Sequence, residues 1–385
     1  METQGTETPS GAAASLRNPG IDLLRGLSIL LVVMHHVGLR IPLKNGILAI
    51  FLPRWVLNAL IFNGYEAVFI FFVISGFLIT THTLQRWGSL ARMDARQFYG
   101  RRAARILPSL VLLVAILSLL HLVGAKDFLI TRASQSLPRT ILSALGLHLN
   151  WYEGQTGWLP GNWDVLWSLS IEEVFYLAFP LVCLGLRRNR VLVPALAALA
   201  LSLPASRAAL AGNAIWQEKA YLPGMAAIAT GVLAAWVVAR CPLTSTWAKR
   251  LLGTAGAMGV GAVLCFEGGL WRLLGNGTLL VLTLSAAFLV VAFHAQGTDQ
   301  GIASFRGTGW LRSFGRLSYE IYLTHMFVVW PVIHAFRAMG ARPWFGILWY
   351  VPTVVMSWGL GWIVARYFSV PAERIFRRRW QASIT

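Results

Sequence analysis

Long apolar runs, separated by short polar segments, make up most of this chain. A helix that crosses a bilayer needs about 20 mostly apolar residues. Ten runs come close to that length, at 21–39, 60–82, 106–124, 165–186, 191–208, 220–239, 251–267, 277–295, 317–336 and 345–367. The pattern predicts an all-α, polytopic membrane protein with about ten transmembrane helices and no soluble second domain.

The polar segments between these runs carry positive charge mainly on one side. With the N-terminus inside and ten spans, the inner segments hold 22 of the 33 Lys and Arg residues. Because cytoplasmic loops are enriched in Lys and Arg, both termini are predicted to be cytoplasmic. A shorter apolar stretch, 137–149, would put later charge-rich segments outside if it crossed the membrane. We expect it to lie in the outer interface or to dip into it.

This topology divides the chain into three parts. Residues 1–20 are small, polar and interrupted by Pro and Gly, which predicts a disordered cytoplasmic tail. Residues 21–368 form the predicted transmembrane domain. Residues 369–385 form a basic cytoplasmic tail.

Composition narrows the class of protein further. The chain is 56% hydrophobic and 12% charged, with a mean hydropathy of +0.62. These values exclude a water-soluble globular protein and a disordered chain. The net charge of +18 then indicates membrane orientation rather than nucleic-acid binding. Cys183, Cys241 and Cys265 show no metal-ligand spacing, so no metal site is predicted.

Charged residues inside membrane spans are costly and usually functional. Arg25 and His36 in the first run are eleven residues apart, which places them within about 20° of one helix face. His35 points about 80° away from that face. The alternative is that Arg25 reaches the inner surface and His36 only packs.

Three other segments place polar groups in or beside apolar runs. Arg101, Arg102 and Arg105 share about one helical turn, which suits phosphate binding or, alternatively, anchoring to anionic lipid. Glu172 and Glu173 face directions about 100° apart; a buried Glu172 would need a partner such as Arg25, His36 or His325. Ser318, Tyr322 and His325 form one polar stripe that could line a cavity.

Five motifs in this order resemble the acyltransferase-3 family of integral membrane acyltransferases, and the match runs over most of the chain. They are RGLSILLVVMHH at 25–36, FIFFVISGFLI at 69–79, FYGRRAARILP at 98–108, WSLSIEEVFYLAFP at 167–180 and LSYEIYLTH at 317–325. Two positions depart from the family pattern. Members often have Glu-x-Pro near the C-terminus, whereas here Glu373 is followed by Arg374 and Ile375. Some members have a His at the position that Val165 occupies here.

The resemblance implies a bacterial inner-membrane enzyme that moves an acyl group, expected to be acetyl, from acyl-CoA to a hydroxyl of a sugar or glycan. It implies His36 as catalytic base or transient acyl carrier, with Arg25 and Glu172 also catalytic. Substrate-binding roles would fall to Arg101, Arg102, Arg105, Ser318, Tyr322 and His325. Membrane lipid, acyl-CoA and a carbohydrate or glycoconjugate acceptor are the expected partners, with no bound cofactor and no nucleic acid.

Two other functions fit the composition and topology. In a proton-coupled transporter or flippase of a lipid-linked sugar, intramembrane His and Glu would relay protons. A structural membrane subunit would leave the polar stripes unexplained. The chain has no P-loop, G-x-S-x-G, H-E-x-x-H or G-x-G-x-x-G motif, which argues against an ATP-driven pump, a serine esterase and a zinc protease.

Overall fold

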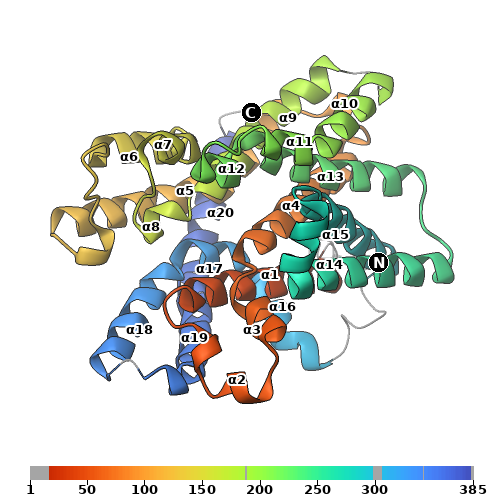
Figure 1. Cartoon of the computed structure of the whole chain (residues 1–385). Helices are drawn as coiled ribbons and strands as arrows, with labels where there is room; N and C mark the ends of the chain where they lie inside the picture. Colours follow the sequence, from red (N-terminus) through yellow and green to blue (C-terminus); the bar gives the residue numbers. More distant parts are fainter. Residues whose placement is uncertain (1–16, 187–188, 298–305, 341, 383–385) are drawn as a thin grey trace, which may run out of the picture.

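A computed structural model describes residues 17–186, 189–297, 306–340 and 342–382, and in these ranges the chain consists of helices and loops without a strand (Figure 1). Most of the predicted N-terminal tail and the last three residues of the predicted basic tail lie outside these ranges. The long helices are α1 (Pro19–Gly38), α4 (Gly64–Trp87), α5 (Ala95–Leu122), α9 (Trp167–Gly185), α13 (Tyr221–Arg240), α14 (Thr246–Leu274), α15 (Gly277–Gln296) and α19 (Ile347–Val364).

Shorter helices connect or extend the long ones. They are α2 (Leu48–Phe51), α3 (Arg54–Ile61), α6 (Leu137–Leu145), α7 (Leu149–Thr156), α8 (Gly161–Asp164), α10 (Asn189–Leu201), α11 (Leu203–Ala208), α12 (Ala214–Lys219), α16 (Gly309–Arg316), α17 (Ser318–Thr324), α18 (Met326–Ala338) and α20 (Val370–Ala382). A π-helical turn, Ala365–Ser369, joins α19 to α20.

In the described ranges, eight helices are long and apolar enough to cross a membrane, which makes this a multi-pass membrane protein. The expected count of ten single spans is not confirmed. The predicted span 191–208 consists of α10 and α11, and the predicted span 317–336 consists of α17 and α18, which meet at His325. A hydropathy profile does not reveal such a break between two helices, because the residues on both sides of the break are apolar.

The site is built around α1, which contacts α4, α15, α16, α17 and α19. Its start is set locally: the Asn18 side chain accepts hydrogen bonds from the backbone N–H groups of Gly20 and Ile21, and Pro19 occupies the first turn. Helix α5 begins in the same way, with Asp94 accepting from the Gln97 N–H. These caps determine the first residue of α1, which carries Arg25, and of α5, which carries the arginine cluster.

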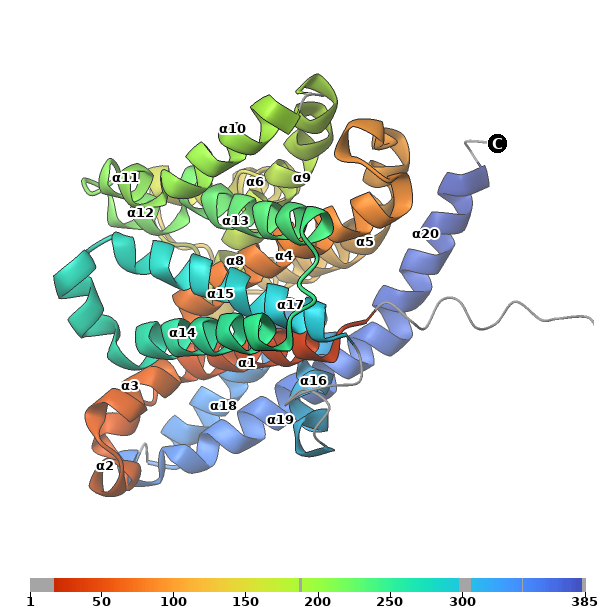
Figure 2. The same cartoon turned by 90° about the vertical axis from the view of Figure 1, so that its right-hand side faces the viewer.

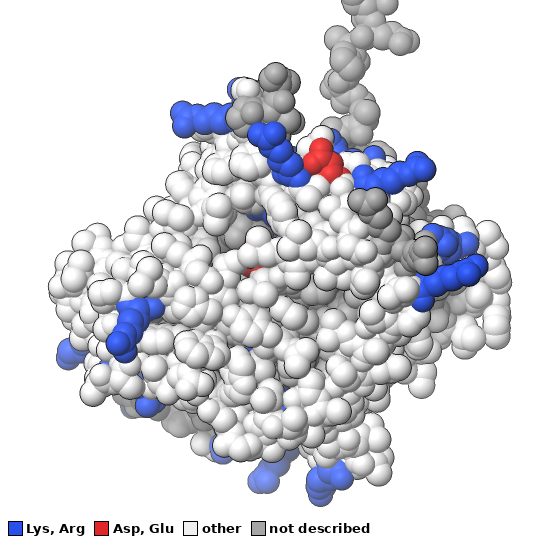
Figure 3. Space-filling view, turned by 90° about the horizontal axis from the view of Figure 1, so that it is seen from above, with Lys and Arg blue, Asp and Glu red and all other residues white. Residues whose placement is uncertain are grey.

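Both described ends of the chain lie at the same end of the molecule. Figure 2 shows the beginning of α1 and the end of α20 on one side and α2 and α3 on the opposite side. Figure 3 shows a broad surface almost free of charged side chains, with Lys and Arg gathered along its edges. Such a surface is suited to contact with lipid.

The stretch 137–149 does not form a membrane span. It contains α6, which has nine residues, and the start of α7, and nine helical residues are far too short for a bilayer. A buried ion-pair cluster anchors this region: Lys219 of α12 pairs with Glu153 of α7 at 2.8 Å and also with Asp164 of α8. The side chains of Lys219 and Glu153 are almost fully buried.

Helices α4 and α13 cross at reciprocal glycines. A Cβ atom at Gly76 would collide with the Ile228 carbonyl, and one at Gly231 would collide with the Val73 carbonyl. Close approach through small residues is the usual way in which membrane helices pack. Gly76 is therefore a packing residue. The preceding residue, Ser75, lines the cavity described below.

This crossing gives a stability prediction. Gly76→Ala is expected to destabilise the protein by about 1–3 kcal/mol, because a backbone carbonyl has to move to make room for the methyl group. The matched control is Gly261→Ala in α14, where an added Cβ has no neighbour within 4 Å and any change should stay within about 1 kcal/mol. Thermal unfolding in detergent gives the melting temperature of each variant. Equal melting temperatures for Gly76→Ala and Gly261→Ala would contradict the close crossing of α4 and α13.

Candidate functional site

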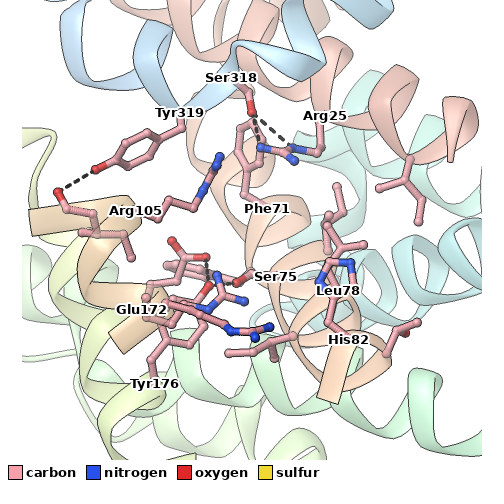
Figure 4. Close-up of a pocket in the computed structure, with 18 of the residues that line it drawn as sticks. Arg25, Phe71, Ser75, Leu78, His82, Arg105, Glu172, Tyr176, Ser318 and Tyr319 are labelled. Atoms are coloured by element: carbon pink, nitrogen blue, oxygen red, sulfur yellow. Dashed lines mark hydrogen bonds between the residues drawn. The ribbon is translucent and has the colours of Figure 1, made fainter. Parts of the chain in front are cut away.

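A cavity of about 470 Å³ lies between α1, α4, α5, α9 and α17. Seven arginines line it against two carboxylates, Asp22 and Glu172; the arginines are Arg17, Arg25, Arg86, Arg101, Arg102, Arg105 and Arg377. Figure 4 shows Arg25, Arg105 and Glu172 reaching toward the same space from different helices. The excess of guanidinium groups makes the cavity suitable for a polyanion.

Arg25 is held in place by the first residue of α17. Its Nε and Nη2 atoms donate to the Ser318 hydroxyl at 3.2 and 2.8 Å (Figure 4). Ser318 is buried, so the contact is shielded from bulk water. Two sequence-predicted site residues, 293 positions apart, thus meet at one hydrogen-bonded junction.

Glu172 forms a second polar group with residues from α4 and α5. Its Oε1 accepts a hydrogen bond from the Tyr176 hydroxyl at 2.9 Å, and the Tyr176 oxygen in turn accepts from Ser75. The Arg102 guanidinium lies 4.5 Å from the centre of the Tyr176 ring. Its hydrogen-bond partner is Tyr176, one helical turn further along α9, rather than one of the three candidates Arg25, His36 and His325. Glu173 does not line the cavity.

Arg105 lies between the cavity and the C-terminal helix. Its guanidinium is 5.6 Å from the centre of the Tyr319 ring and 3.8 Å from the Glu373 carboxylate. Arg101 and Arg102 line the same cavity. The predicted cluster on α5 therefore faces an internal space rather than only lipid or solvent.

Tyr322 and Ser168 form the far end of the cavity. The Tyr322 hydroxyl donates to the Val165 carbonyl at 2.9 Å, and its oxygen accepts from Ser168 at 2.6 Å. Beyond this pair lies His325, whose ring centre is 6.1 Å from that of Tyr322.

His36 and His325 form a pair just beyond that end, with ring centres 4.9 Å apart. Neither lines the cavity, although the sequence predicted that His325 would. Nδ1 of His36 lies 2.9 Å from the Val32 carbonyl, and Nδ1 of His325 lies 2.8 Å from the Tyr322 carbonyl. A carbonyl can only accept a hydrogen bond, so each Nδ1 carries the hydrogen and each Nε2 presents a lone pair.

His35 has a packing role, in agreement with the helical-face argument that favoured His36. Its Nδ1 lies 3.0 Å from the Ile61 carbonyl. A Cβ at Gly64 would overlap its ring, so the imidazole is pressed against α4.

Sequence reasoning missed several residues of the site. Tyr176 and Ser75 were part of quoted motifs, and the four-residue spacing from Glu172 to Tyr176 could have indicated their contact. Arg377 had no such signal, because only the fold brings α20 to the cavity. In the described ranges, no group of three or more His, Cys, Asp or Glu side chains could hold a metal ion.

A comparison with known protein families supports the family that the order of the five motifs indicated. The family model described as an acyltransferase domain matches residues 18–366, which includes every predicted site residue. The chain belongs to the acyltransferase-3 family. No solved structure matches it.

Similar curated proteins are O-acetyltransferases. Peptidoglycan O-acetyltransferase OatA of Listeria monocytogenes is 25% identical over 377 residues, covering 88% of this chain and 54% of that protein. O-acetyltransferase OatA of Staphylococcus aureus is 27% identical over 175 residues, covering 43% of this chain and 24% of that protein. This acyltransferase-3 chain thus spans about half of the Listeria relative.

Proposed function

We propose that this protein is a membrane O-acyltransferase that moves an acetyl group from acetyl-CoA to a hydroxyl of a cell-envelope glycan. The observation that carries the proposal is an arginine-lined cavity that ends beside two histidines with free Nε2 lone pairs. The names of the relatives, which are O-acetyltransferases, support the same reaction.

The donor chemistry follows from the charge of the cavity. Acyl-CoA is a long molecule with phosphates at one end and the thioester at the other. Arg101, Arg102 and Arg105 would bind the phosphates through charge-assisted hydrogen bonds. The thioester would then point toward Tyr322 and the histidine pair, where Ser318 holds Arg25 at the side of its path.

His36 would act as the general base. As the acceptor hydroxyl attacks the thioester carbonyl, a C–O bond forms and its proton passes to Nε2 of His36. The C–S bond then breaks, and the departing CoA thiolate takes up that proton. A neutral imidazole suits this role near neutral pH, and the Nδ1–carbonyl contact holds the ring in the required tautomer.

The other site residues would support this step. Arg25, which lines the cavity eleven residues before His36 on α1, would bind and orient the donor on its way to the histidines. Glu172 would orient the Tyr176–Arg102 group, and His325 would position the His36 ring. Tyr322 and Ser168 would have to move apart for the acyl group to reach His36, because their hydrogen bond closes this end of the cavity.

The acceptor would approach from a different side. His36 is partly exposed but does not line the arginine-rich cavity, so its exposed part faces another space. With the arginine-rich end and both termini in the cytoplasm, the acceptor would be a glycan at the outer surface of the bacterial inner membrane. The Listeria relative is named for peptidoglycan, which makes peptidoglycan the first acceptor to test.

The arginine cluster gives a direct test of the donor site. Arg102→Ala and Arg105→Ala are each expected to raise the KM for acetyl-CoA about 10- to 100-fold, because each removes a charge-assisted contact to phosphate. The control is Arg250→Ala, an exposed arginine on α14 that does not line the cavity. Equal KM values for all three variants, with normal membrane insertion, would show that the cluster does not bind the donor.

A further inference from the structure

The C-terminal helix reaches the cavity although it lies outside the part of the chain that matches the family. The family model ends at residue 366, whereas α20 comprises Val370–Ala382. Arg377 of α20 lines the cavity together with the arginines of α5. Figure 2 shows α20 at the end of the molecule where α1 begins.

Close packing fixes α20 against α5. A Cβ at Gly100 would overlap the indole of Trp380, so the absence of a side chain at Gly100 makes room for this tryptophan. Ser109 of α5 and Ser369, at the end of the π-helical turn, are joined by a 3.0 Å hydrogen bond. The π turn lies directly before α20, and such turns often occur at functional sites.

Glu373 connects Arg377 to the arginine cluster. Its carboxylate lies 2.5 Å from Arg377 Nη2, one turn further along α20, and 3.8 Å from Arg105 Nη1 on α5. The side chain of Glu373 is 19% exposed and that of Arg377 is 50% exposed. A single carboxylate thus holds two guanidinium groups at the cavity wall and leaves the outer one accessible to a ligand.

The position of Arg377 determines which part of the donor it can meet. Ser168 and Tyr322 close the far end beside the histidines, whereas Arg377 is half exposed and belongs to the terminal helix. If the thioester of acyl-CoA lies near Tyr322, the opposite end of the molecule lies near Arg377. That end is the adenosine that carries the 3′-phosphate.

We propose that α20 completes the donor site and that Arg377, oriented by Glu373, binds the 3′-phosphate of the acyl-CoA nucleotide. The inference rests on the proposed function, since it takes acyl-CoA as the donor. Arg377 is the specificity-determining residue that distinguishes CoA from its 3′-dephospho form. Glu373 is a positioning residue that acts through Arg377 and Arg105.

Binding of α20 to anionic lipid is the competing explanation. The helix also carries Arg374, Arg378 and Arg379, which are exposed and do not line the cavity. A lipid role would depend on all these arginines alike. A donor role depends on Arg377 alone, so Arg378→Ala, one residue away, is a matched control.

The test uses the full-length protein in detergent with two donors, acetyl-CoA and acetyl-3′-dephospho-CoA. We expect the wild type to bind acetyl-CoA at least about tenfold more tightly than the dephospho form. Arg377→Ala should bind both donors equally, at the affinity that the wild type has for the dephospho form. Arg378→Ala should behave as the wild type, and Glu373→Gln should lose part of the discrimination between the two donors.

Different failures have different meanings. If Arg377→Ala keeps the wild-type preference, or if Arg378→Ala loses as much of it, the assignment of Arg377 is wrong while the donor site stands. If the wild type binds neither donor, the proposed function itself fails.

Discussion

His36→Ala is expected to lower kcat by about 10²- to 10⁴-fold, the usual contribution of a general base. The Nδ1 contact with Val32 leaves Nε2 of His36 as a proton acceptor, and alanine removes that acceptor. Affinity for acetyl-CoA should stay close to that of the wild type, because His36 does not line the arginine-rich cavity. Acetyl transfer and direct CoA binding by the purified protein measure the two effects separately.

The control is His334→Ala, a histidine on α18 whose side chain is 51% exposed and pairs with Asp127. Its activity should equal that of the wild type. If His36→Ala retains wild-type turnover, His36 is not the base. If it loses CoA binding to the same extent as turnover, its role is to shape the donor site.

Arg25→Ala is expected to lower kcat/KM by about 10- to 100-fold, because the cavity loses a charge-assisted contact that orients the donor. Arg25 can donate from several N–H groups, and Ser318 occupies only Nε and Nη2. Arg25→Lys keeps the charge but loses the forked geometry, so it should restore only part of the rate. Steady-state kinetics over a range of acetyl-CoA concentrations gives both values.

Ser318→Ala distinguishes donor binding by Arg25 from a structural role. It removes the hydroxyl that holds the guanidinium but leaves the charge in the cavity, so we expect a loss of about tenfold or less. If Ser318→Ala and Arg25→Ala lose the same activity and the same thermal stability, Arg25 acts as a structural link between α1 and α17.

Local periodicity predicted a good part of the site. The eleven-residue spacing of Arg25 and His36 falls on one continuous helix, α1. The 100° separation of Glu172 and Glu173 correctly implied that only one of them faces the cavity. Of the predicted stripe, Ser318 and Tyr322 line the cavity, whereas His325 lies beyond its end.

Contacts between helices could not be read in the same way. The pairing of His36 with His325 and the closure of the cavity by Tyr322 and Ser168 depend on how α1, α9 and α17 pack. The ends of α10 and of α17 fall within apolar sequence, where hydropathy gives no signal. Arg377 reaches the cavity only because Gly100 lets α20 approach α5.

The most direct test supplies acetyl-CoA labelled in its acetyl group to the cytoplasmic side of membrane vesicles that contain the wild type or His36→Ala. O-acetyl esters are removed by mild alkali, whereas N-acetyl amides are not. We predict that the wild type places alkali-labile label on the cell-envelope glycan and that His36→Ala places none. Absence of such label with the wild type, or equal labelling by His36→Ala, would contradict acyl transfer at this site.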